Sequence, residues 1–253
     1  MSCCCCNNRK RVIKSGDLYE DRKPEMRPLD LLVFRGGDFV SNCISVLEKR
    51  GHANAQGGNF THAGMIVDNT IIDEPLLLDN TLYILESTAS GKLGSGVYNI
   101  YGHAMIGVQI RTLDDVIHAY DVPSETAIAW CPLIHNPLDV VEDLIDIKDT
   151  CTKLYRKYNG RAWDANCWSL CSALYPPCRP CRPCIERVLH TEDWVFCSEL
   201  VADYYVALDI LPKTVIPANV LPADLVYPNE DSDDMPVIVS KINEITTQPH
   251  FDK

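Results

Sequence analysis

The sequence has no apolar run of the roughly 18–20 residues that a membrane-spanning helix needs. Its first eight residues, Met1 to Asn8, also lack the apolar core of a secretory signal peptide. Basic residues are scarce, since 23 Lys and Arg face 35 Asp and Glu and the net charge is −12. Such a chain binds phosphate backbones poorly, so we expect no nucleic-acid partner. We expect a protein that is not secreted and that stays inside a cell or a virion, in the cytoplasm or at a membrane.

Neither a repeat nor a strong compositional bias marks the 253 residues as a whole. The apolar fraction of 46% and the charged fraction of 23% are typical of a globular protein with a substantial core. The sequence therefore indicates a folded domain, but it predicts nothing about the oligomeric state.

Cysteine is abundant, with 13 residues. An odd number cannot pair fully within one chain, and without a secretion signal we expect free, metal-bound or catalytic thiols rather than a disulfide framework. Four of them are consecutive near the N-terminus: Cys3, Cys4, Cys5 and Cys6. Acylation of these four would give peripheral membrane association, and the alternative is an unmodified polar tail.

A second cluster has the spacing C-x6-C-x2-C-x2-C, with Cys171, Cys178, Cys181 and Cys184 as its members. Four thiolates close in sequence could ligate zinc and stabilise an interaction module. The competing interpretation is a Pro- and Arg-rich surface insert, because the run lacks the paired knuckles of a zinc ribbon. We favour the insert, and we expect neither a metal nor another cofactor.

Short apolar runs predict strands at 29–35, 60–67, 82–86, 108–111 and 126–130. Helical spacing predicts helices at 38–49, from 138 to 158, and from Cys197 onward. Strands followed by helices indicate an α+β fold. We expect a tail at 1–26, one domain at 27–228 with a Cys/Pro-rich insert at about 171–190, and a C-terminal extension at 229–253.

Cys197 opens the last predicted helix, within Phe196-Cys197-Ser198-Glu199-Leu200-Val201. A thiol in the first turn is exposed to the partial positive charge of the helix N-terminus, which favours the thiolate. The N–H groups of that turn can also donate to an oxyanion. The alternative is an inert core cysteine.

Two further residues complete a candidate nucleophile, base and orienter. His62 lies on a predicted strand among the small residues Thr61, Ala63 and Gly64, which leave room beside the imidazole. Glu86 ends the next predicted strand, where its carboxylate could orient His62. Alternatives are a structural histidine, a solvated glutamate, and Ser87 or Thr88 as orienter.

Several short motifs, in this order, resemble the circularly permuted branch of the NlpC-type papain-like superfamily, which includes YiiX-like and lecithin retinol acyltransferase-like proteins and members from large DNA viruses. Leu29-Asp30-Leu31-Leu32 resembles its opening Gly-Asp-Leu-Leu, with Leu29 in place of Gly. His62-Ala63-Gly64-Met65-Ile66-Val67 resembles its histidine strand, and Leu85-Glu86-Ser87 resembles the strand that follows. The segments 107–113 and 158–164 resemble two further motifs. Phe196-Cys197-Ser198-Glu199-Leu200-Val201 resembles its nucleophile motif, and Leu221-Pro222-Ala223-Asp224-Leu225 its closing motif.

The resemblance implies a small antiparallel β-barrel or sheet packed against the nucleophile helix, with the histidine strand first in the chain. It implies a thiol hydrolase (peptidase, amidase or lipid esterase) or an acyltransferase, with Cys197, His62 and Glu86 as catalytic residues and no metal. Peptides, amides or lipid acyl groups are the substrates expected. The alternatives are a non-enzymatic, virion-associated protein with a papain-like fold, and the zinc-stabilised interaction module.

Overall fold

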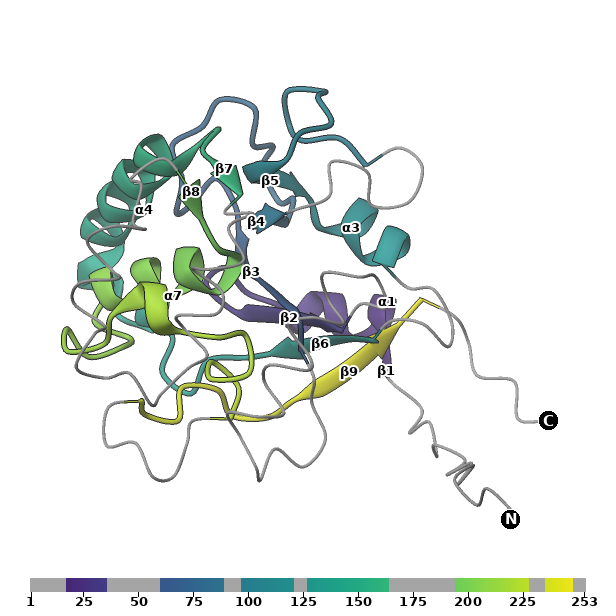
Figure 1. The fold of residues 1–253 in the computed structure, drawn as a ribbon. Helices are drawn as coiled ribbons and strands as arrows, with labels where there is room; N and C mark the ends of the chain where they lie inside the picture. Colours follow the sequence, from purple (N-terminus) through teal and green to yellow (C-terminus); the bar gives the residue numbers. More distant parts are fainter. Residues whose placement is uncertain are drawn as a thin grey trace, which may run out of the picture.

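The computed structural model describes residues 17–35, 60–88, 97–120, 127–163, 194–227 and 235–247. Within these ranges the chain forms an α+β fold, with an open, mostly antiparallel sheet of seven strands and four α-helices (Figure 1). The predicted α+β class is confirmed.

The sheet has the order β1-β9-β6-β2-β3-β4-β5. Every neighbouring pair is antiparallel except β1 and β9. A separate parallel pair is formed by β7 and β8. The strands are β1 (Asp17–Leu18), β2 (Leu31–Arg35), β3 (His62–Val67), β4 (Tyr83–Thr88), β5 (Gly107–Thr112), β6 (Ala127–Cys131), β7 (Ala162–Trp163), β8 (Trp194–Val195) and β9 (Asn243–Thr246).

The helices lie on both faces of this sheet, as Figure 1 shows for α4 and α7 against α1 and α3. The α-helices are α1 (Tyr19–Arg22), α3 (Leu113–Tyr120), α4 (Leu144–Tyr158) and α7 (Cys197–Ala207). Four short 3-10 helices are η1 (Lys23–Glu25), η2 (Pro137–Asp139), η3 (Val141–Asp143) and η5 (Pro217–Asn219).

The central strands separate two apolar cores, because successive side chains of a strand point to opposite faces. Leu31, Val33 and Met65 face a core that also contains the buried residues of α4 and α7. Leu32 and Ile66 face a second core that is covered by α1 and α3. Strands buried on both faces read as continuous apolar runs, which is why Leu31 to Phe34 carries no polar residue.

The turn before β2 is fixed by buried polar contacts. Asp30 Oδ2 accepts a hydrogen bond of 2.9 Å from Trp130 Nε1 on β6, and the Tyr205 hydroxyl on α7 donates one of 2.8 Å to the Leu29 carbonyl. Leu29 has φ +74°, in the left-handed region that favours glycine. These contacts hold α7 close to the strands that it covers.

The predicted elements agree with the observed ones, with differences at their ends. The five predicted strands correspond to β2 to β6, and the helix predicted from Cys197 is α7. The helix predicted from 138 begins as two short 3-10 turns and becomes α-helical only at Leu144, because Asn136 caps η2 with Pro137 at its first position. The helix predicted at 38–49 lies outside the described residues.

Two segments that we assigned outside the domain contribute to the sheet. Residues 17–26, expected in the tail, contain β1 and α1, and the Tyr19 ring is fully buried between this segment and α3. Residues 243–246, expected in the extension, form β9 beside β6. Both strands are short and have little apolar alternation, so their pairing depends on distant partners. Across the described ranges, none of the helices combines the length and apolarity that crossing a membrane would require.

Candidate active site

Cys197 is the first residue of α7, as predicted, and it is 5% exposed. The preceding Phe196 is the N-cap, and its backbone N–H donates a hydrogen bond of 3.2 Å to Glu199 Oε2. The carboxylate of Glu199 therefore satisfies the backbone at the entry to the helix, as in the reciprocal half of a capping box. Cys197 thus lies at the N-terminus of α7. The backbone N–H groups in the first turn of the helix give this end a partial positive charge.

Two buried serines attach the start of α7 to the rest of the domain. The Ser87 hydroxyl on β4 donates a hydrogen bond of 2.7 Å to the Val195 carbonyl, two residues before Cys197. The Ser198 hydroxyl donates one of 2.7 Å to the Val220 carbonyl, just after η5. The thiol is thus placed by contacts on both sides of its own residue.

The groups around the Cys197 thiol favour its ionised form. Burial alone would raise the pKa of this thiol, but the His62 ring and the backbone of Ala63 and Ser198 lower it. Ala63 lies on β3 just beyond Gly64, where the pairing of β3 with β4 ends. The thiolate is thus favoured by neighbouring backbone as well as by the imidazole.

His62, at the start of β3, bridges Cys197 and Glu86. Its Nε2 lies 2.6 Å from Glu86 Oε2. Because Nε2 is engaged by Glu86, Nδ1 is the ring nitrogen left to interact with the Cys197 sulfur. Phe34 and Tyr120 lie beside the ring with centroids 5.4 and 6.3 Å away, and the Tyr120 ring is nearly parallel to it at 6°. The imidazole side chain is only 12% exposed.

Glu86 is fully buried on β4 and has a second charged partner, Arg111 on β5. Arg111 Nε donates a hydrogen bond of 2.6 Å to Glu86 Oε1, and Nη2 donates to the same oxygen. Sequence reasoning missed Arg111. The sequence predicted a strand here but assigned no role to Arg111, and alternation of Gln109 and Arg111 with Val108 and Ile110 gives no signal that both faces of β5 are buried.

These contacts shift three pKa values in directions that favour an ion pair. Burial opposes the imidazolium, but the Cys197 thiolate and Glu86 outweigh it and raise the pKa of His62 to about 10. Burial also opposes the ionised Glu86, but Arg111 and His62 lower its pKa to about 2. For Cys197 burial is again outweighed, chiefly by His62, and the pKa of the thiol is lowered.

The other described cysteines have the opposite shift. Cys131 and Cys151 are buried, and burial raises the pKa of both thiols, that of Cys151 to about 12. Unlike Cys197, neither of these two thiols has an imidazole that lowers its pKa. A low pKa at Cys197 is therefore a property of its site, and the other two thiols are inert references.

The remaining candidate residues lie outside the described ranges: Cys3, Cys4, Cys5 and Cys6, and Cys171, Cys178, Cys181 and Cys184. No group of three or more His, Cys, Asp or Glu side chains suited to a metal ion occurs in the part of the chain that the structure describes.

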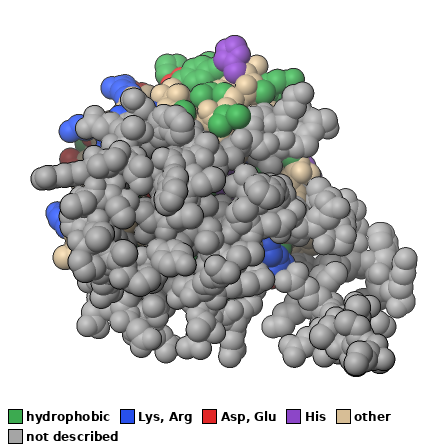
Figure 2. All heavy atoms as spheres, in the orientation of Figure 1, with side chains coloured by type: hydrophobic (Ala, Val, Ile, Leu, Met, Phe, Trp, Pro, Cys, Tyr) green, Lys and Arg blue, Asp and Glu red, His purple; other side chains and the backbone are tan. Residues whose placement is uncertain are grey.

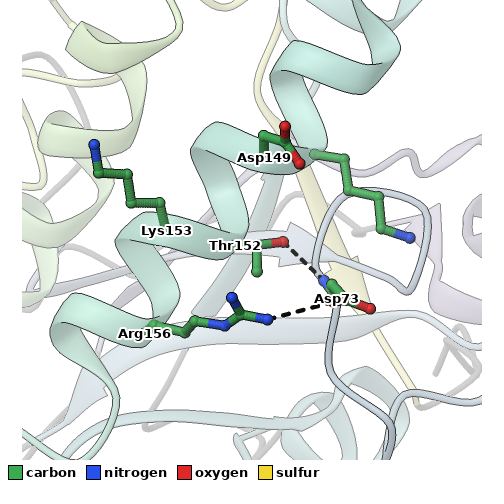
Figure 3. A pocket seen from close by; sticks show the side chains of 6 residues that line it. Asp73, Asp149, Thr152, Lys153 and Arg156 are labelled. Carbon is green, nitrogen blue, oxygen red and sulfur yellow. Dashed lines mark hydrogen bonds and ion pairs between the residues drawn. The ribbon is translucent and has the colours of Figure 1, made fainter.

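A groove of about 400 Å³ lies against α4, away from the Cys197 cluster (Figure 3). Its wall includes Thr152, whose hydroxyl accepts from the Asp73 backbone at 2.9 Å, and Arg156, which reaches Asp73 at 3.3 Å. Both members of the Arg156–Asp73 pair are more than two-thirds exposed, so this groove is a solvated surface feature. Apolar side chains also gather at the upper edge of the molecule in Figure 2. Exposed large apolar residues include Leu78 before β4, and Tyr98 and Ile106 before β5. Neither surface includes a residue of the Cys197 cluster.

Comparison with protein-family models gave no match, and comparison with curated proteins gave no significantly similar sequence.

Proposed function

We propose that the chain is a cysteine-dependent acyl hydrolase or acyltransferase, with Cys197 as nucleophile, His62 as general base and Glu86 as the residue that orients His62. One observation carries this proposal: His62 hydrogen-bonds a buried carboxylate and lies near enough to Cys197, at the first position of a helix, to lower the pKa of its thiol. This is the nucleophile–base–orienter arrangement of covalent catalysis, in which the base activates the nucleophile and the third group fixes the base.

The reaction begins with attack of the Cys197 thiolate on a carbonyl carbon of a peptide, amide or lipid ester. A C–S bond forms, and N–H groups in the first turn of α7 stabilise the oxyanion. When the tetrahedral intermediate collapses, the C–N or C–O bond breaks and the leaving group takes the proton from His62. Water or another acceptor then attacks the thioester, His62 takes its proton, and the C–S bond breaks to restore the thiolate.

We further propose that the fold is papain-like with a permuted order of its parts. In support, the histidine strand β3 precedes the nucleophile helix α7 in the chain, and α7 packs directly on β3 and β4. The left-handed φ of +74° at Leu29 is a second support, because the resembled family has glycine at this position.

The test is the rate of iodoacetamide alkylation at each cysteine, followed by mass spectrometry as a function of pH. An ordinary thiol with a pKa near 8.5 is less than about 1% thiolate at pH 6. We expect Cys197 to react at least about tenfold faster than Cys131 and Cys151 at pH 6, because the thiolate is the reactive form. His62→Ala and His62→Gln should remove most of this advantage.

Covalent chemistry is tested separately with p-nitrophenyl acetate as an activated ester. We expect a burst of nitrophenolate and one acetyl group on Cys197 in the intact mass, both absent in Cys197→Ala. The proposal fails if folded wild-type protein shows neither fast alkylation of Cys197 at pH 6 nor acetylation of that residue.

A further inference from the structure

The side chain of Arg111 is 1% exposed, and its partner Glu86 is fully buried. Breaking such a buried pair leaves an uncompensated charge, while replacing the whole pair by apolar groups is often neutral or stabilising. Stability alone is therefore a weak reason for a charged pair here, and its location next to His62 is the informative feature.

Three neighbouring strands place the charges in one row. Gly64 pairs with Glu86, so His62 lies diagonally across from Glu86 on the same face of β3 and β4. Ile84 pairs with Arg111, so Arg111 lies diagonally across from Glu86 on β5. The row is built on the backbone of adjacent strands, which keeps its members at fixed distances.

The two oxygens of Glu86 are divided between these neighbours. Nε and Nη2 of Arg111 both donate to Oε1, and His62 Nε2 lies at Oε2. A carboxylate held by a two-donor guanidinium contact has little freedom to rotate. Arg111 thus presents Oε2 to the imidazole, and the bond between Oε2 and Nε2 leaves Nδ1 as the ring nitrogen available to Cys197.

Charge counting gives the second consequence of this row. With Cys197 as thiolate and His62 as imidazolium, Glu86 and Arg111 complete two negative and two positive charges, and the buried cluster is neutral. Without Arg111 the same cluster carries a net negative charge away from water, which is unfavourable. The cluster then favours taking up a proton, and we expect this proton on Cys197, where it removes the thiolate.

We propose that Arg111 is a positioning residue that sets the pH range in which Cys197 is a thiolate, acting through Glu86 and His62. This inference rests on the proposed function, since it concerns the same thiol. Arg111 would be a further residue of the proposed site, and one that does not touch the reacting atoms. The low pKa of Glu86, near 2, agrees with it.

The experiment measures the pH midpoint for alkylation of Cys197 by iodoacetamide in the full-length wild type, Arg111→Met, Arg111→Lys and the double variant Glu86→Gln with Arg111→Met. Arg156→Met is the matched control, because it removes an arginine from an exposed pair with Asp73. Circular dichroism confirms that each variant is folded. Should Arg111→Met fail to fold, the double variant and Arg111→Lys still carry the test.

We expect the midpoint in Arg111→Met to rise by at least about one pH unit, with a tenfold loss of alkylation rate below the wild-type midpoint. The double variant lacks the charges of both Glu86 and Arg111, so the buried cluster again has no net charge when Cys197 is a thiolate and His62 an imidazolium. Its midpoint should therefore return toward the wild-type value. Arg111→Lys keeps the charge and should shift the midpoint less than Arg111→Met. Arg156→Met should leave it unchanged.

A wild type with fast alkylation at pH 6, together with an unshifted midpoint in folded Arg111→Met, would overturn the role of Arg111 and leave the proposed function intact. So would a double variant that shows no return toward wild type, because a loosened fold is not repaired by a second substitution. Slow alkylation in the wild type itself would count against the proposed function and against this inference with it.

Discussion

The Ser87 hydroxyl on β4 donates a hydrogen bond of 2.7 Å to the Val195 carbonyl, which joins the sheet to the segment that leads into α7. We predict that Ser87→Ala lowers the free energy of unfolding by about 1–2 kcal/mol, because it leaves a buried carbonyl without its donor. It should also slow alkylation of Cys197, since the start of α7 is then held less firmly.

The control for this prediction is Ser240→Ala, which removes a similar bond to the Pro132 carbonyl at an exposed position. Its effect on denaturant unfolding should stay within about 0.5 kcal/mol. Equal unfolding midpoints for Ser87→Ala and wild type would show that the Ser87 bond does not stabilise the junction.

Glu86 makes stability depend on pH at the acidic end. Its pKa is about 2 in the folded protein, below the ordinary value of 4.5. The ionised carboxylate therefore adds to the free energy of unfolding above pH 4.5, and this contribution is lost as the pH falls toward 2. We predict that Glu86→Gln lowers the free energy of unfolding by about 3–5 kcal/mol at pH 7, because it leaves Arg111 without its counter-charge. The difference between wild type and variant should shrink steadily in urea titrations from pH 5 to pH 2.5, and a constant difference over this range would contradict the prediction.

His62 gives the opposite dependence at the alkaline end. Its pKa rises from 6.5 to about 10 on folding. The imidazolium therefore makes its full contribution to the free energy of unfolding below pH 6.5, and this contribution is lost as the pH rises toward 10. We predict that the stability difference between wild type and His62→Gln falls between pH 7 and pH 10. Urea unfolding at these pH values measures the difference, with His135→Gln as the control, since the His135 side chain is exposed. A difference that grows with pH would show that the imidazolium does not stabilise the fold.

The Tyr120 and His62 rings lie nearly parallel, with their centroids 6.3 Å apart. We predict that Tyr120→Leu raises the midpoint for alkylation of Cys197 by about 0.3–1 pH unit, because the π face stabilises the imidazolium by an amount on the order of 0.5–1 kcal/mol. Tyr120→Phe keeps the ring and should keep the midpoint. The prediction is contradicted if both variants shift equally, which would assign the effect to the hydroxyl.

Gly107 is required where β5 begins, because its φ is +123° and a Cβ there would lie 2.0 Å from the Arg161 carbonyl oxygen. We predict that Gly107→Ala destabilises the protein by roughly 2–4 kcal/mol, from strain and from the forced shift of backbone. Gly102→Ala is the matched control, since its φ is +75° but nothing lies within 4 Å of the added Cβ. That variant should cost only about 1 kcal/mol in the same unfolding experiment.

Local pattern was sufficient to predict the elements that carry the site. The apolar run after His62 and the helical spacing after Cys197 are signals within single segments. The helix begins at Cys197 as predicted, and β3 begins at His62, two residues after the predicted start. Glu86 was proposed from its position at the end of a strand, and the register of β3 with β4 brings it to His62.

The partner of Glu86 could not be predicted in the same way. Arg111 reaches Glu86 only because Ile84 pairs with Arg111 in the register of β4 with β5. A long connection separates these two strands, and their register cannot be deduced from the sequence of either strand alone. The pairing of β1 with β9 is a stronger case, because Asp17–Leu18 and Asn243–Thr246 meet from opposite ends of the chain. Composition at either end gives no signal for such a contact.

The order of β3, β4, β5 and α7 along the chain has a consequence for synthesis. A ribosome delivers His62, Glu86 and Arg111 well before Cys197, and it delivers β9 of the same sheet only after Cys197. A chain that stops before α7 thus contains the three charged residues of the sheet but not the thiol beside them. The proposed nucleophile is the last member of its cluster to be synthesised, so any activity that depends on Cys197 requires nearly the whole chain.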